Sequence, residues 1–187
     1  MKIKRIIPVI ILFAMVIAWT IFLYILSPEG LVHALGIRNS YIILFLVSLL
    51  GGTSLFLPFP YYLFTISFGA AGLNPLLLGI IAGTGVLIGD LTSYFIAYEA
   101  RSIAPKKYTK IIKRIYDWSE KKNPYIFPIL AFLYASFIPL PDDIIMVPTG
   151  LMRYPLIRVI VPLTLGKIVF NTLLALSGLY GFSLLFT

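Results

Sequence analysis

The stretch Phe137-Ile-Pro-Leu-Pro-Asp-Asp143 interrupts an apolar run that begins at Pro124. Two prolines separated by one residue remove two backbone donors and clash with the preceding turn, so a helix cannot continue through them. A second interruption of the same form, Pro58-Phe-Pro60, lies inside the uncharged tract from Ser40 to Gly89. The two Pro-x-Pro breaks therefore predict that both apolar regions are divided into shorter helical segments.

The composition around these breaks is that of an integral membrane protein. Of the 187 residues 60% are hydrophobic and only 12% are charged, and the mean hydropathy is +1.00. A soluble domain carries about 25% charged residues. The net charge of +8 indicates cytoplasmic segments beside anionic lipid, and no nucleic-acid partner. With no cysteine and a single histidine, His33, we expect no enzyme activity, no metal site and no cofactor.

The apolar runs suggest where helices cross the bilayer. The uncharged run at 6–26 follows a basic amino terminus and is long enough to span about 30 Å of hydrocarbon. We interpret it as a first transmembrane helix, and the alternative is a cleaved signal peptide. A polar loop is expected from Ser27 to Asn39, and long helices from Leu76 to Tyr98 and from Leu156 to about Phe186.

Residues 99–123 form a basic segment that holds eight of the 15 Lys and Arg residues. Its apolar residues recur at helical spacing, which predicts an amphipathic helix on the membrane surface. The alternative is a solvated loop packed on the protein. In either case the positive charge places the amino terminus and this segment in the cytoplasm, for a multi-pass protein of the plasma membrane.

The two Pro-x-Pro breaks belong to an internal repeat, which we assign to residues 40–98 and 124–186. The order in each half is a break, a short apolar segment, a glycine, a turn with proline, and a helix carrying one charge. The correspondences are Pro58 and Pro60 with Pro139 and Pro141, Gly69 with Gly150, Asn74-Pro75 with Tyr154-Pro155, and Gly89-Asp90-x-x-x-Tyr94 with Gly166-Lys167-x-x-x-Asn171.

The cytoplasmic placement of both basic regions determines the expected topology. Residues 40–73 then start and end outside, and residues 124–153 start and end inside. We therefore predict an all-α integral membrane protein of two inverted repeats, each a re-entrant helical hairpin plus a transmembrane helix, with an extra N-terminal transmembrane helix. Inverted repeats with broken helices at mid-bilayer are typical of secondary transporters. The alternative treats 41–57 and 125–138 as ordinary spans and the prolines as kinks.

Acidic residues at the second hairpin tip are the sharpest functional signal. Asp142 and Asp143 lie where a charge costs several kcal/mol unless it is hydrated, protonated or paired. Adjacent like charges favour proton uptake by one of them, which suits proton coupling or cation coordination. The alternative is capping of the helix that begins near Ile144.

Two further charges occupy equivalent places in the two repeats. The helical rise puts Asp90 about 21 Å inward from Leu76 and Lys167 about 16 Å outward from Leu156. In a core of about 30 Å these depths nearly coincide, so we predict that Asp90 and Lys167 pair. Tyr94 and Asn171 are secondary polar candidates. Two arginines, Arg101 and Arg153, are candidates for contact with a phosphate, or they are interfacial anchors.

These motifs resemble those of the DedA/VTT (SNARE-associated) superfamily of membrane proteins. The resemblance rests on the paired Pro-x-Pro tips, the Gly89-Asp90 helix, and the stretches 137–143 and 150–155. It implies half-inserted hairpins and transport, in several members the proton-coupled flipping of undecaprenyl phosphate or phospholipids. Members of that family usually carry an acidic residue near the first tip, where this chain has Tyr61-Tyr62. The chain is therefore similar to a divergent branch, nearer the YqaA-like or small multidrug-export-like members.

We accordingly expect a transporter that flips a lipid-linked phosphate or a phospholipid across the bilayer, with carboxylate protonation as the coupling step. Membrane lipids are the expected partners, and the sequence allows a homodimer without deciding it. A small-molecule or cation exporter that uses the same acidic site is the first alternative. A non-transporting membrane scaffold is the second, although a scaffold does not need buried charges.

Overall fold

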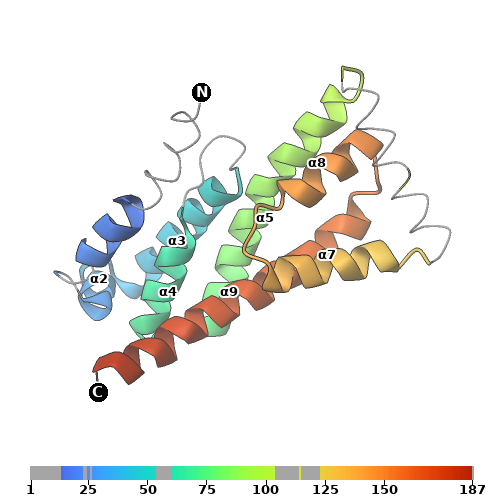
Figure 1. Cartoon of the computed structure of the whole chain (residues 1–187). Helices are drawn as coiled ribbons and strands as arrows, with labels where there is room; N and C mark the ends of the chain where they lie inside the picture. The colour runs from blue at the N-terminus through green and yellow to red at the C-terminus, as the bar shows by residue number, and fades with distance from the viewer. Residues whose placement is uncertain are drawn as a thin grey trace.

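The fold is helical throughout the part of the chain that the computed structural model describes, namely residues 14–22, 25, 27–53, 60–103, 114 and 123–186. Within these residues there is no strand, as predicted from the sequence (Figure 1). The helices are α2 (Pro28–Leu35), α3 (Ile37–Gly52), α4 (Tyr62–Ala70), α5 (Pro75–Ala100), α7 (Ile126–Phe137), α8 (Asp143–Met152) and α9 (Ile157–Phe186).

Two of the described helices are long and apolar enough to cross a membrane by themselves. They are α5, with 26 residues, and the part of α9 from Ile157 to Gly181. The side chain of Asn74 caps α5 by accepting from the backbone N–H groups of Leu76 and Leu77, and Pro75 follows as the first helical residue. Because these start signals of α5 are local, the sequence predicted its bounds within about two residues. The bounds predicted for α9 agree as closely.

The expected polar loop at 27–39 is wrong, because most of it is helical. The Ser27 hydroxyl accepts from the N–H of Gly30 and so caps α2, whose first residue is Pro28. At Gly36 the chain turns with φ of 81° and α3 begins directly. Polar composition suggested a loop, but a serine cap followed by proline begins a helix. The α2–α3 pair is bent by 101° and together is long enough to count as a third candidate span.

Both Pro-x-Pro regions lie between short helices. The second break is described completely: α7 ends at Phe137, Ile138 is extended, and α8 begins at Asp143. At the first break α3 ends at Gly52 and α4 begins at Tyr62, with Pro60 buried just before it, whereas Pro58 lies outside the described residues. Most of 6–26 and of 99–123 also lies outside them, and residues 14–22 are helical.

The helices pack in a crossed arrangement around the α5–α9 pair (Figure 1). α3 lies along α5 and α4 along α9, while α7 lies along α9 and α8 along α5. Glycines permit this close approach: a Cβ on Gly89 would overlap the backbone of α3, and one on Gly166 would lie 2.7 Å from the Phe132 carbonyl of α7. Each short helix pair thus contacts both long helices.

The apolar core is divided into two clusters. One cluster gathers residues of α2 to α5 and Ala175 of α9, with Phe68 and Leu78 fully buried. The other gathers residues of α5, α7, α8 and α9, with Met146 and Leu163 fully buried. On α9, Lys167 lies between Leu163 of one cluster and Ala175 of the other. On α5, Asp90 lies between Leu87 and Tyr94, which both belong to the second cluster.

Candidate functional site

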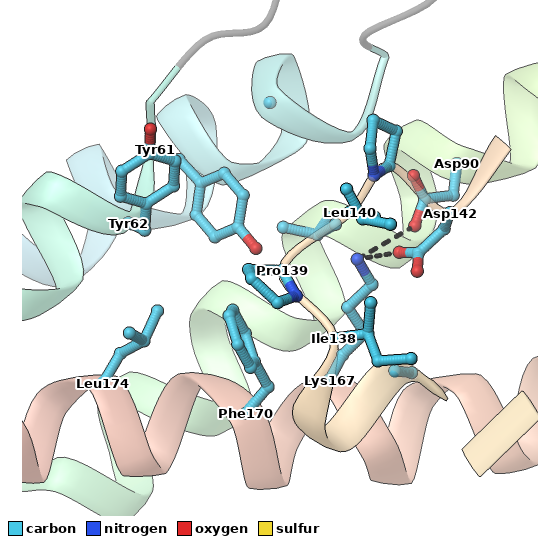
Figure 2. A pocket seen from close by; sticks show the side chains of 14 residues that line it. Tyr61, Tyr62, Asp90, Ile138, Pro139, Leu140, Asp142, Lys167, Phe170 and Leu174 are labelled. Carbon is cyan, nitrogen blue, oxygen red and sulfur yellow. Dashed lines mark ion pairs between the residues drawn. The ribbon is translucent and has the colours of Figure 1, made fainter. Parts of the chain in front are cut away.

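Lys167 forms ion pairs with two carboxylates that come from different parts of the chain. Its Nζ lies 3.6 Å from Oδ2 of Asp90 on α5, and it also pairs with Oδ2 of Asp142 at the start of α8 (Figure 2). The exposed fractions are 3% for Asp90, 3% for Asp142 and 7% for Lys167. The predicted Asp90–Lys167 pair is confirmed, and it includes a second carboxylate that the sequence analysis did not assign to it.

The position of Asp142 argues against one of the two interpretations of its carboxylate, the capping of α8. Asp142 is the N-cap residue of α8, but its side chain makes no capping hydrogen bond. Its carboxylate contacts Lys167 of α9 instead. A capping side chain accepts hydrogen bonds from its own helix, whereas the Asp142 carboxylate joins the second break to α9. The sequence contained a signal for this Asp142–Lys167 pair, because the second hairpin tip and Lys167 were both expected near mid-bilayer.

A third carboxylate adds negative charge to this group. Asp143 lies in the first turn of α8, is half-buried, and is within electrostatic range of Asp90 and of the Tyr134 side chain. Its Oδ1 is buried and has no hydrogen-bond partner among the described residues. Two carboxylates thus pair with one amine, and a third lies within electrostatic range of Asp90. An unbalanced buried charge costs several kcal/mol, so the group favours a proton, a cation or a change of partner.

The charged residues open onto a cavity of about 420 Å³, within the size range of ligand pockets. Figure 2 shows Asp90, Asp142 and Lys167 on one side of it and Tyr61, Tyr62 and Leu174 on the other. The cavity is therefore amphipathic. Its wall consists of Gly51, Tyr61, Tyr62, Val86, Asp90, Ala135, Ile138, Pro139, Leu140, Pro141, Asp142, Lys167, Phe170 and Leu174.

The polar neighbours of the ion pairs include Asn171 and Tyr61. Asn171 is fully buried one turn after Lys167, and its Nδ2 donates to the Lys167 carbonyl at 2.9 Å. The Tyr61 hydroxyl lies near the Asn171 side chain and within electrostatic range of Asp90. Sequence reasoning singled out Asn171 but not Tyr61, because a tyrosine in an apolar run carries no distinctive signal.

The other predicted residues lie apart from the cavity. The Tyr94 hydroxyl donates to the Tyr154 carbonyl at 2.8 Å, which joins α5 to the segment directly after α8. Arg153 is exposed, adopts a left-handed conformation with φ of 54°, and places its guanidinium 4.4 Å from the ring centre of Tyr98. Arg101 is exposed at the end of α5. Neither arginine contributes to the cavity wall.

The break prolines shape one side of the site. Pro139 and Pro141 line the cavity, and Pro60 is buried immediately before Tyr61. The Pro141 carbonyl accepts from the Tyr134 hydroxyl at 2.9 Å, so part of the freed backbone is satisfied by a side chain. Among the described residues no group of three His, Cys, Asp or Glu side chains is arranged to hold a metal ion.

Comparison with known proteins identifies the family but gives no individual relative. No curated protein and no solved structure is significantly similar to this chain. The model of the VTT domain matches residues 59–180. That range extends from the end of the first break into α9, and it contains all three charged residues of the ion-pair group. The chain therefore belongs to the VTT domain family, the DedA superfamily of membrane proteins.

Proposed function

We propose that this protein is a non-enzymatic transporter that flips a lipid-linked phosphate or a phospholipid across the plasma membrane, coupled to proton movement. The observation that carries the proposal is Lys167, a buried amine shared by Asp90 and Asp142 at the wall of an amphipathic cavity. Membership of a membrane-protein family associated with transport supports the same class of function.

Competition for the Lys167 amine provides the coupling step. A proton taken up by Asp90 or Asp142 neutralises that carboxylate and weakens its hold on the amine. The released ammonium group pairs with the phosphate of the substrate, while the lipid chain lies against the aromatic and aliphatic wall formed by Tyr62, Phe170 and Leu174. Loss of the proton restores the internal ion pair and displaces the phosphate.

Alternating access follows from the proposed inverted repeat. In this arrangement the amino terminus and residues 99–123 are cytoplasmic, and the two Pro-x-Pro hairpins enter the membrane from opposite faces. Lys167 contacts a carboxylate from each half, Asp90 of the first and Asp142 of the second. Rocking of one half against the other would expose the amine to one side of the bilayer at a time.

A second candidate, export of a cationic small molecule, is favoured by the excess of carboxylates. Asp90, Asp142 and Asp143 together outnumber the single amine of Lys167. An incoming organic cation could replace Lys167 as their partner. The two candidates differ in which charged group the substrate contacts, so the loss of Lys167 should distinguish them.

Proteoliposomes provide the test. We expect the wild-type protein to flip a fluorescent polyprenyl phosphate or phosphatidylglycerol, with rates that differ between pH 6 and pH 8, and Lys167→Gln to lower the rate at least about tenfold. Arg38→Gln removes an exposed positive charge of α3 and serves as the matched control. Efflux of a fluorescent organic cation without lipid flipping would establish the exporter, and neither activity would indicate a scaffold.

A further inference from the structure

The register of the internal repeat relates Tyr61 to Asp142. Pro58 and Pro139 are 81 residues apart, as are Pro60 and Pro141. The same offset carries Tyr61 onto Asp142, so the first break is followed by a phenol where the second is followed by a carboxylate. Because Gly89-Asp90 matches Gly166-Lys167, the counterpart of the Asp142–Lys167 contact is a contact between Tyr61 and Asp90.

One of these two equivalent contacts is made in the structure, and the other is open. Lys167 pairs with Asp142 across the second break. Across the first break, Tyr61 and Asp90 both line the cavity and lie within electrostatic range of each other, but Asp90 is paired with Lys167 and the Tyr61 hydroxyl lies near Asn171. The Tyr61 ring packs directly on Gly51, where a Cβ would come within 3.1 Å of the ring carbon Cγ, so the glycine allows the ring its place on the cavity wall.

From this arrangement we propose that the Tyr61 hydroxyl is the alternative partner of the Asp90 carboxylate. A buried carboxylate that loses its cation needs another donor. A phenol O–H donating to a carboxylate makes a short charge-assisted hydrogen bond. In this view Tyr61 is a positioning residue: it holds Asp90 whenever Lys167 is engaged elsewhere. That a phosphate is the group which draws Lys167 away from Asp90 rests on the proposed function. The Tyr61–Asp90 contact itself does not depend on that function.

A double-mutant cycle tests the contact without any substrate. Lys167→Gln removes the amine, so Asp90 then depends on Tyr61, and adding Tyr61→Phe removes that donor while keeping the ring. We expect the double variant to lose at least about 2 °C more in melting temperature at pH 8 than the sum of the single losses. The matched control is Tyr62→Phe in the same background, which also removes a phenol from the cavity wall and should be additive.

Infrared spectroscopy distinguishes a hydrogen bond to Asp90 from mere packing of the Tyr61 ring, because packing alone would not change the protonation of Asp90. The band of protonated Asp90, identified by its loss in Asp90→Asn, should grow when Tyr61→Phe is added to Lys167→Gln and should not change with Tyr62→Phe. If Lys167→Gln does not fold, the cycle and the spectra are repeated with Asp142→Asn added, which removes the second unpaired carboxylate. Additive melting temperatures together with an unchanged Asp90 band would overturn the proposal, even if lipid flipping is found. If Tyr61 and Asp90 are coupled in a protein that flips no lipid, the Tyr61–Asp90 contact is supported and the proposed lipid substrate is rejected.

Discussion

The two Pro-x-Pro regions have the same place in the packing but carry different chemistry. The segment before each break packs along the long helix that follows it in the chain, α3 on α5 and α7 on α9, and the segment after each break packs along the other long helix. After the first break stand Tyr61 and Tyr62, and after the second stand Asp142 and Asp143. The long helices differ in the same way, with Asp90 on α5 and Lys167 on α9.

This difference teaches that two regions with the same packing can carry different charges. Equivalent positions bring four polar side chains to one cavity, and their identities decide which of them pair. Lys167 is the only cation on the cavity wall among the described residues, so both carboxylates that flank it converge on one amine. The second half supplies the cation and one anion, and the first half supplies the other anion and a hydroxyl.

The largest expected effect is the loss of the shared cation. Lys167→Gln leaves Asp90 and Asp142 buried without their partner, and we expect a loss of about 3–5 kcal/mol in the free energy of unfolding near neutral pH. Adding Asp90→Asn should recover only part of this, and adding Asp142→Asn as well should recover most of it. Chemical denaturation in detergent measures each variant. Full recovery by Asp90→Asn alone would mean that Asp142 does not depend on Lys167.

The next prediction compares the effects on transport of the two neighbouring carboxylates after the second break. Asp142 is buried and paired with Lys167, whereas Asp143 is half-buried and only within electrostatic range of Asp90. We expect Asp142→Asn to lower the transport rate at least about tenfold and Asp143→Asn to lower it less, with both proteins folded, and the double variant to be inactive. Proteoliposome rates across a pH series measure this. Equal effects would show that the direct ion pair has no special role.

The smallest expected effect on the protein comes from a test of orientation. The chain has no cysteine, so Asn39→Cys and Arg114→Cys each introduce one thiol at an exposed position. Each change should alter stability by less than about 0.5 kcal/mol. An impermeant thiol reagent added to intact cells should label position 39 and not position 114. Labelling of 114 from outside would contradict the inverted arrangement of the two halves, and the unaltered chain is the control.

Much of the fold was predictable because its signals are local. Asn74-Pro75 caps α5 and Pro139-x-Pro141 ends α7, and both act through the backbone of their immediate neighbours. The expected loop at 27–39 failed for a related reason: its charges suggested solvent, but the cap at Ser27 and the turn at Gly36 allow two short helices to meet. Local composition is a weaker guide than the hydrogen bonds available at a helix end.

The sequence by itself was enough to predict a helical membrane protein in which Asp90 and Lys167 pair, because helical rise converts a position along each helix into an expected depth. Only the tertiary structure decided that Asp142 reaches the same amine instead of capping α8, and that Tyr61 lines the same cavity as Asp90. The expected depth of a residue depends only on its position along its own helix. Which side chains meet depends on the rotation and crossing of several helices, which the packing of glycines such as Gly89 and Gly166 sets.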